Sequence, residues 1–290
     1  MNNPHLIAIL SLFVAAIVSA APDERPKTVH NSFYAMDTSY GRPGLSREQQ
    51  LDLVKELGFA GVSENIRPPA EMKNAREEIE VRGLKLFAVY AGAQVTPKGD
   101  LVVSSDLPAV MNVLKGSGAI IWLHIGGKGP AFDSLTGNEP VCKNIRELSD
   151  AAKANGMRIA VYPHFGEWTA KFGDATTLAT IINHESFGVT FNLCHCLATG
   201  DEKKIAALID AAGPRLFTAT INGADTGFGG ADWSRLIQPL GKGSFDVKIV
   251  LDSLQRIHFA GPIGFQGYGI AGDTRSILEP TIKAWKTLLP

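Results

Sequence analysis

The sequence has little of what marks several common protein classes. It contains three cysteines, Cys142, Cys194 and Cys196, which are too few for a disulfide framework. Acidic and basic residues nearly balance, 29 against 28, so there is no basic excess to hold a phosphate backbone. The segment MDTSYGRPGLS, after the first predicted strand, does not fit the GxGxxG turn of dinucleotide-binding sheets. We therefore expect neither a disulfide-rich domain nor a nucleic-acid partner nor an open Rossmann sheet.

Only one apolar run is long, and it lies at the N-terminus. Residues 6–20, LIAILSLFVAAIVSA, are too short for a comfortable membrane span, and Val18 and Ala20 fit a signal peptidase site. No Lys or Arg precedes the run, so an uncleaved anchor is the alternative. We expect a signal peptide at 1–20, a polar linker at 21–30 and an exported protein, periplasmic or secreted, that has no membrane contact after cleavage.

The remaining 270 residues repeat one unit, in which a short apolar strand precedes a segment of helical period. The predicted strands are SFYAMD, AGVSENI, KLFAVYAG, AIIWLHIG, RIAVYPHF, GVTFNLCH, RLFTATING and GPIGFQGY. Helices are clearest at 46–58, 70–83 and 201–213, each ending at a Gly. Eight such units predict a single (β/α)8 barrel over residues 31–290.

Cys194 and Cys196 lie two residues apart at the end of an apparent strand. Their Cα atoms would be about 6.5 Å apart in a strand, which is at the limit for a disulfide. We interpret them as buried small apolar residues, with a Cys-His-Cys metal site as the alternative.

Polar side chains collect where the later strands end, which is where barrels of this class carry their sites. They are His124 and Lys128 after the fourth strand, Tyr162, His164, Glu167 and Trp168 after the fifth, Asn192 and His195 after the sixth, Asn222 and Asp225 after the seventh, and Gln266 and Tyr268 after the eighth. Alternation along the strand places Tyr162 and His164 on one face. We expect a common site at this end of the barrel.

Several of these segments resemble one family, the xylose-isomerase-like TIM barrels, which includes sugar isomerases, epimerases and abasic-site endonucleases. HFGEW is similar to that family's HxxEF run, NLCHCLATGDE to its DxxH segment with a following Gly-Asp, and NGAD to its HxKD run. PLGKGSFD resembles its Gly-x-Gly turn leading to Asp, and GPIGFQGYG takes the place of its final strand. The order and spacing agree over the whole mature chain.

The resemblance implies one divalent metal held by Glu, Asp, His and Glu on the last four strands. The matching residues here are Tyr162, Asn192, Asn222 and Gln266. Neutral amides and a phenol are weak ligands for a hard cation, although amides suit sugar hydroxyls because they donate and accept. We therefore assign no metal ligand and leave the cofactor unknown, with a divalent metal as an open alternative.

His164 and His195 remain as candidates for proton transfer near neutral pH, and Glu167 for orienting His164 or joining it as a metal ligand. Predicted substrate contacts are His124, Lys128, Tyr162, Trp168, Asn192, Asn222, Asp225 and Gln266, with Trp233, Phe228 and Tyr268 as further candidates for stacking on a sugar ring.

The resemblance favours a sugar isomerase or epimerase that acts on a carbohydrate or keto-sugar by proton transfer next to a carbonyl. A carbohydrate-binding barrel without metal or catalysis is the alternative, and a sugar lyase or hydrolase is a further one. An abasic-site nuclease fits poorly, because it needs several metals and a basic groove. Oligomeric state is left open.

Overall fold

Eight parallel strands close into a barrel, as predicted. The computed structural model describes Met1 and residues 31–288. The barrel strands are β1 (Phe33–Ala35), β2 (Gly61–Asn65), β3 (Lys85–Val95), β5 (Ile120–Gly127), β6 (Arg158–Val161), β7 (Phe187–Asn192), β8 (Leu216–Ile221) and β9 (Ile263–Phe265). They pair in that order, and the pairing of β1 with β9 closes the ring. Each of the eight predicted strands is confirmed.

The predicted signal peptide at 1–20 and linker at 21–30 lie outside the described residues, apart from Met1. Among the residues that are described, no helix is long and apolar enough to cross a membrane.

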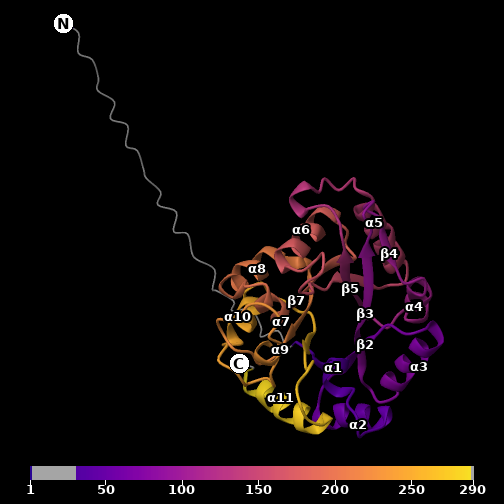
Figure 1. The fold of residues 1–290 in the computed structure, drawn as a ribbon, viewed down its shortest axis with the longest axis vertical. Helices are drawn as coiled ribbons and strands as arrows, with labels where there is room; N and C mark the ends of the chain where they lie inside the picture. The colour runs from indigo at the N-terminus through magenta and orange to yellow at the C-terminus, as the bar shows by residue number, and fades with distance from the viewer. Residues whose placement is uncertain (2–30, 289–290) are drawn as a thin grey trace.

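Helices form an outer layer around the strands (Figure 1). They are α1 (Asp37–Tyr40), α2 (Arg47–Leu57), α3 (Pro69–Glu80), α4 (Leu107–Val113), α5 (Pro140–Ala154), α6 (Phe172–Ile182), α7 (Leu193–Ala198), α8 (Ile205–Ala212), α9 (Trp233–Leu236), α10 (Lys248–Arg256) and α11 (Thr274–Leu288). The ends of α2 follow from its sequence. Ser46 and Gln49 form a reciprocal capping box, and Gly58 ends the helix in the left-handed conformation, φ 91°.

A ninth strand, β4 (Leu101–Val103), was not predicted. It pairs antiparallel with the end of β3, which continues to Val95, beyond the predicted end at Gly92. The turn TPKGD joins the two strands, with the N–H of Thr96 donating to the carbonyl of Asp100. The hairpin extends the barrel wall at the end where the site was expected.

The expectation that Cys194 and Cys196 continue a strand is wrong. Strand β7 stops at Asn192, and both cysteines lie in the short helix α7. Asn192 starts that helix, because its side-chain oxygen accepts the N–H of His195 at 3.3 Å. Both cysteines are buried and unbridged.

Two apolar layers hold the barrel together. The larger one lies between the strands and the outer helices. The smaller fills the barrel interior with Tyr34, Met36, Ala88, Ile120, Trp122, Ala160, Tyr162 and Phe217. Since this interior is packed with side chains, it is a core and not a channel. Tyr162 lies in this core and also lines a cavity above it, so the core supports the floor of that cavity.

Candidate functional site

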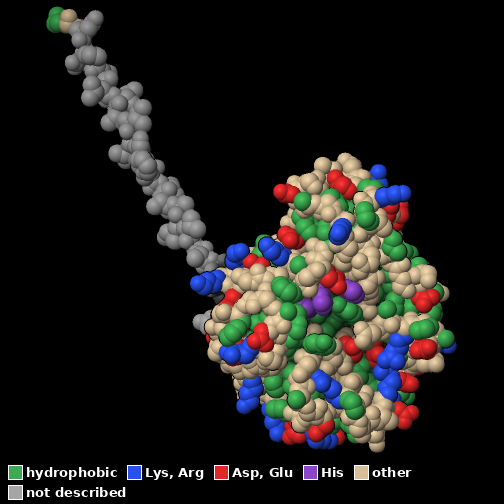
Figure 2. Space-filling model, viewed as in Figure 1, with side chains coloured by type: hydrophobic (Ala, Val, Ile, Leu, Met, Phe, Trp, Pro, Cys, Tyr) green, Lys and Arg blue, Asp and Glu red, His purple; other side chains and the backbone are tan. Residues whose placement is uncertain are grey.

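A cavity of about 290 Å³ opens at the carboxyl ends of the strands. Its lining is Met36, Asp37, Thr38, Asn65, Tyr90, Tyr162, His164, His195, Trp233, Ile237, Gln266 and Tyr268. Figure 2 shows histidine side chains gathered near the centre of this face, in a hollow between apolar side chains. The volume is at the lower end of the range for small-molecule sites.

Six residues singled out from the sequence meet in this cavity. They are Tyr162, His164, His195, Trp233, Gln266 and Tyr268. These residues come from the segments after four different strands, so the shared position at the strand ends does bring them together.

At the cavity floor, three of the four positions that match the family's metal ligands bond to one another. The Nδ2 of Asn192 and the Nε2 of Gln266, the latter at 3.3 Å, both donate to the phenol oxygen of Tyr162. Backbone N–H groups fix both amides in this orientation. The N–H of His195 donates to the Oδ1 of Asn192, and the N–H of Tyr268 donates to the Oε1 of Gln266 at 3.0 Å. The amide N–H groups must therefore face the phenol.

The fourth position, Asn222, is turned toward the backbone. Its Nδ2 donates to the carbonyls of Gly223 and Leu236, each at 2.7 Å. Its Oδ1 is buried and finds no hydrogen-bond partner in the part of the chain that the structure describes.

This donor set does not fit a divalent cation. The amide oxygens of Asn192 and Gln266 already accept hydrogen bonds, and their N–H groups point at the position that a metal would share with Tyr162. Hard cations depend on anionic oxygens, and burial holds the pKa of Tyr162 well above its usual range, so the phenol stays neutral. Within residues 31–288 there is also no cluster of three or more His, Cys, Asp or Glu arranged as metal ligands.

The rings of His164 and His195 lie 4.3 Å apart, centroid to centroid. The peptide groups of Phe165 determine where each imidazole carries its proton. The N–H of Phe165 donates to the Nδ1 of His195 at 3.2 Å, so that imidazole carries its proton on Nε2. The carbonyl of Phe165 lies 3.2 Å from the Nδ1 of His164 and can only accept, so His164 carries its proton there and has a free lone pair on Nε2.

His195 is buried, with 5% of its surface exposed. Burial, with a smaller contribution from the nearby His164, lowers the pKa of His195 to about 3. The imidazole is therefore neutral near pH 7 and acts as a hydrogen-bond donor through Nε2.

Glu167 contacts a different histidine from the one expected. Both of its carboxylate oxygens lie 2.9 Å from the Nδ1 of His124, whereas the nearest approach to the Nδ1 of His164 is 3.8 Å. His124 in turn stacks on Tyr90, with ring centroids 4.6 Å apart. Glu167 therefore fixes His124, which supports an aromatic wall of the cavity.

The other predicted contact residues lie outside the cavity lining. Asp225 pairs with the Nε of Arg235 at 2.5 Å, and the same guanidinium covers the ring of Phe228. Trp168 stacks on Phe132 and donates to the carbonyl of Pro130, and Lys128 is exposed. The contacts of Asp225 and Trp168 therefore hold loops in place.

Sequence reasoning missed the contributions of the first three strands. Asp37 and Thr38 follow β1, Asn65 ends β2, and Tyr90 lies in β3; all four line the cavity. The signal was present, because the rule that selected His164 and Gln266 applies equally to these strand ends.

Comparisons with known proteins agree with this architecture. The family model described as "Xylose isomerase-like TIM barrel" matches residues 51–282, whereas none of the curated proteins compared with the chain matches it.

Solved structures similar to the chain include a xylose isomerase-like TIM barrel/4-hydroxyphenylpyruvate dioxygenase fusion protein, with 16% identity, TM-score 0.66, and coverage of 89% of this chain and 42% of that one. The 3-keto-D-glucoside 4-epimerase YcjR from E. coli has 14% identity and TM-score 0.63, with coverage of 89% and 99%. A D-allulose 3-epimerase from Methylomonas sp. has 16% identity and TM-score 0.65, with coverage of 91% and 99%. At such identities the likeness shows the fold alone, while the family match, which spans most of the sequence, shows that the chain belongs to the xylose isomerase-like TIM barrel family.

Proposed function

We propose that this protein moves a proton next to the carbonyl of a carbohydrate or keto-sugar, as an isomerase or epimerase that does not use the family's metal. The observation that carries the proposal is the pair His164 and His195, which line one cavity and carry their protons on opposite nitrogens. A free imidazole lone pair beside an imidazole N–H supplies both groups that enolisation needs.

The roles follow from the assigned protons. The Nε2 of His164 is the base that removes the proton from the carbon next to the carbonyl. The Nε2–H of His195 donates to the carbonyl oxygen, where negative charge develops as the C–H bond breaks. A neutral imidazole suits this role because it stabilises the oxyanion without first having to be charged.

The cavity lining supports a polyhydroxylated ligand. Trp233 and Tyr268 offer aromatic faces, and the amide of Asn65 can both donate and accept hydrogen bonds. The hydroxyl of Thr38, which donates to the Oε1 of Gln266, can still accept. The similarity to sugar epimerases, YcjR among them, points to the same substrate class.

Deuterium exchange tests the proposal directly. D-fructose, D-allulose and methyl 3-keto-D-glucoside are each incubated with the chelator-treated protein in D2O, and deuterium next to the carbonyl is followed by NMR. We expect incorporation with the native chain and a loss of about 10²- to 10⁴-fold in His164→Gln. His184→Gln is the matched control, because His184 pairs with Asp150 outside the cavity. Absence of exchange from all three sugars overturns the proposal.

A carbohydrate-binding barrel without catalysis is the second candidate. The amides of Asn192 and Gln266, which are hydrogen-bonded to Tyr162, favour this candidate, because they replace carboxylates that bind the metal elsewhere in the family. Calorimetric binding of a sugar without exchange would support this candidate. A lyase or hydrolase would instead show loss of the sugar from the NMR spectrum.

We also propose that the protein acts after export, on the basis of the apolar run at residues 6–20 and its small-residue end. N-terminal sequencing of the protein from its native cell tests this. A mature chain that begins at Ala21 supports export, and an intact Met1 counts against cleavage.

A further inference from the structure

Asp37 supplies a carboxylate to the cavity that holds His164 and His195. It is the first residue of α1, directly after β1, and its side chain is half-buried in the cavity lining. None of the roles assigned above uses it.

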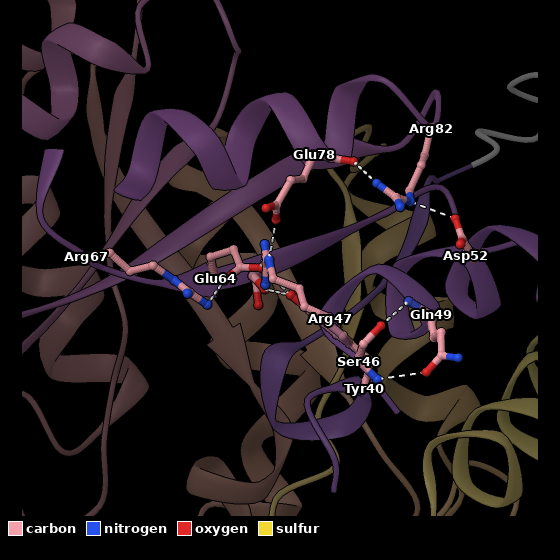
Figure 3. Close-up of polar contacts among 10 residues, drawn as sticks. Tyr40, Ser46, Arg47, Gln49, Asp52, Glu64, Arg67, Glu78 and Arg82 are labelled. Atoms are coloured by element: carbon pink, nitrogen blue, oxygen red, sulfur yellow. Dashed lines mark hydrogen bonds and ion pairs between the residues drawn. The ribbon is translucent and has the colours of Figure 1, made fainter. Parts of the chain in front are cut away.

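The neighbouring acid, Glu64, is already paired with two arginines. Arg47 and Arg67 contact its two carboxylate oxygens at 2.9 and 2.8 Å, and the hydroxyl of Tyr40 donates to it (Figure 3). Glu64 is 1% exposed, and its network of ion pairs extends through Arg47 to Glu78.

Asp37 lies beside this network without belonging to it. The Nδ2 of Asn65 donates to its Oδ2 at 2.5 Å. Within the described residues it forms no ion pair, although Arg47, Glu64 and Arg67 line an adjoining cavity with it. Burial, and then the charge of Glu64, raise the pKa of Asp37 to about 6. The carboxyl group can therefore both hold and release a proton close to neutral pH.

The barrel order places Asp37 opposite His164. Around the ring β1, β2, β3, β5, β6, β7, β8, β9, the strands β1 and β6 are four steps apart in either direction. Asp37 follows β1 and His164 follows β6, so the two side chains approach the cavity from opposite walls. A sugar carbon held between them presents one face to each group.

We infer that Asp37 is the second acid/base of the site, and that with His164 it makes the reaction an inversion at the carbon next to the carbonyl. This inference rests on the proposed function. His164 Nε2 takes the proton from one face, and the C–H electron pair moves into the enolate, whose oxygen is held by His195. The carboxylic acid of Asp37 then delivers its proton to the opposite face, which forms the new C–H bond and leaves a carboxylate.

The reverse reaction starts from that product state, with His164 protonated and Asp37 ionised. Both productive states hold one proton between the two groups, so kcat/KM has the same bell-shaped pH dependence in both directions. A single acid/base group on one side of the cavity can exchange the C–H proton with solvent, but it cannot invert the configuration of the carbon.

The test separates exchange from inversion. D-fructose and D-allulose differ only in configuration at C3, so each is incubated in D2O with the native chain and with Asp37→Asn. We expect Asp37→Asn to lose interconversion of the two sugars by about 10²-fold or more, and to lose deuterium incorporation by a similar factor from the epimer whose C3–H faces Asp37, while the epimer whose C3–H faces His164 still exchanges. Asp37→Glu should restore part of the interconversion, and the exposed Asp252→Asn should match the native protein in both readouts.

The outcomes distinguish the two proposals. Undiminished interconversion by folded Asp37→Asn overturns the role of Asp37 and leaves the role of His164 intact. No exchange by the native chain overturns the proposed function, and the role of Asp37 falls with it.

A titration of the native protein covers the case in which Asp37→Asn does not fold. The carboxyl carbon of Asp37, followed by 13C NMR, should titrate at about pH 6 and shift when His164 is replaced by Gln. A carboxyl group that titrates in its ordinary acidic range, unaffected by His164→Gln, overturns the inference.

Discussion

The imidazoles of His164 and His195 lie 4.3 Å apart, and the backbone of one residue, Phe165, contacts the Nδ1 of both, with its N–H at His195 and its carbonyl at His164. Two like side chains in one cavity thereby acquire unlike roles. The difference between the two proton positions depends on the backbone of Phe165 and not on a bound substrate.

Acid should destabilise the fold through His195. Its pKa is about 3 in the folded chain against 6.5 ordinarily, so the unfolded chain binds the proton more readily between these values. The contribution of His195 to stability is fully present above pH 6.5 and falls as pH decreases toward 3, by about 3 kcal/mol at pH 4. Urea unfolding at pH 8 and pH 4 should show this loss in the native chain and a smaller one in His195→Gln. An equal loss in both chains would contradict the assignment, and His184→Gln serves as the control.

Asp37 should limit stability at alkaline pH. A carboxyl group whose pKa rises from 3.8 to about 6 on folding holds its proton more tightly in the folded state. The contribution of Asp37 to stability is then greatest below pH 3.8 and declines as pH rises to 6, by up to about 3 kcal/mol before allowance for its partial exposure. Asp37→Asn should be more stable than the native chain at pH 8, by about 1–3 kcal/mol, with the difference disappearing near pH 4. A variant less stable than native at pH 8 would refute this.

Tyr162→Phe should cost about 2–4 kcal/mol, because it leaves the N–H groups of Asn192 and Gln266 buried without an acceptor. Tyr34→Phe is the matched control. Tyr34 is equally buried in the barrel, but its hydroxyl makes one long contact, 3.3 Å, with Thr218, so about 1 kcal/mol or less is expected. Equal losses in urea unfolding would show that the phenol is not the centre of the amide cluster.

Divalent metal should not stabilise the protein. A ligand present at 100 times its Kd adds about 2.7 kcal/mol to the stability of the folded state, which thermal unfolding detects readily. We expect the same Tm in chelator and in millimolar MnCl2 or ZnCl2, because the amide oxygens at the family's metal position already accept hydrogen bonds. A rise in Tm that chelator reverses, with stoichiometric metal in the purified protein, would mean that the two amide groups rotate so that their oxygens bind the metal.

The barrel followed from the sequence because each strand is a short apolar run between helices with clear ends, such as Ser46 and Gly58 around α2. Local rules were less successful in two places. Cys194 continues an apolar run in the sequence, yet Asn192 ends the strand by capping α7. The hairpin of β3 and β4 has only three residues in its second strand, too few for a period to emerge.

The site was predicted in part for a similar reason. Position at a strand end brought His164, His195 and Gln266 together, since that property follows from the fold. The partner of Glu167 could not be predicted, because His124 reaches it from another strand, 43 residues away in sequence. The role of Phe165 could not be predicted either, because peptide groups are present at every position.

The contact of Phe165 with both histidines has a consequence for how such sites are found and redesigned. Both contacts come from the main chain, so they are kept when the side chain at position 165 is replaced by almost any other. Only proline, which lacks the N–H, removes one of the two contacts. Comparing residue types among related barrels would therefore overlook position 165, although its backbone determines which nitrogen of each histidine carries the proton. A designer who wished to swap the two proton positions would have to reorient the two peptide groups that flank residue 165 instead of substituting a side chain.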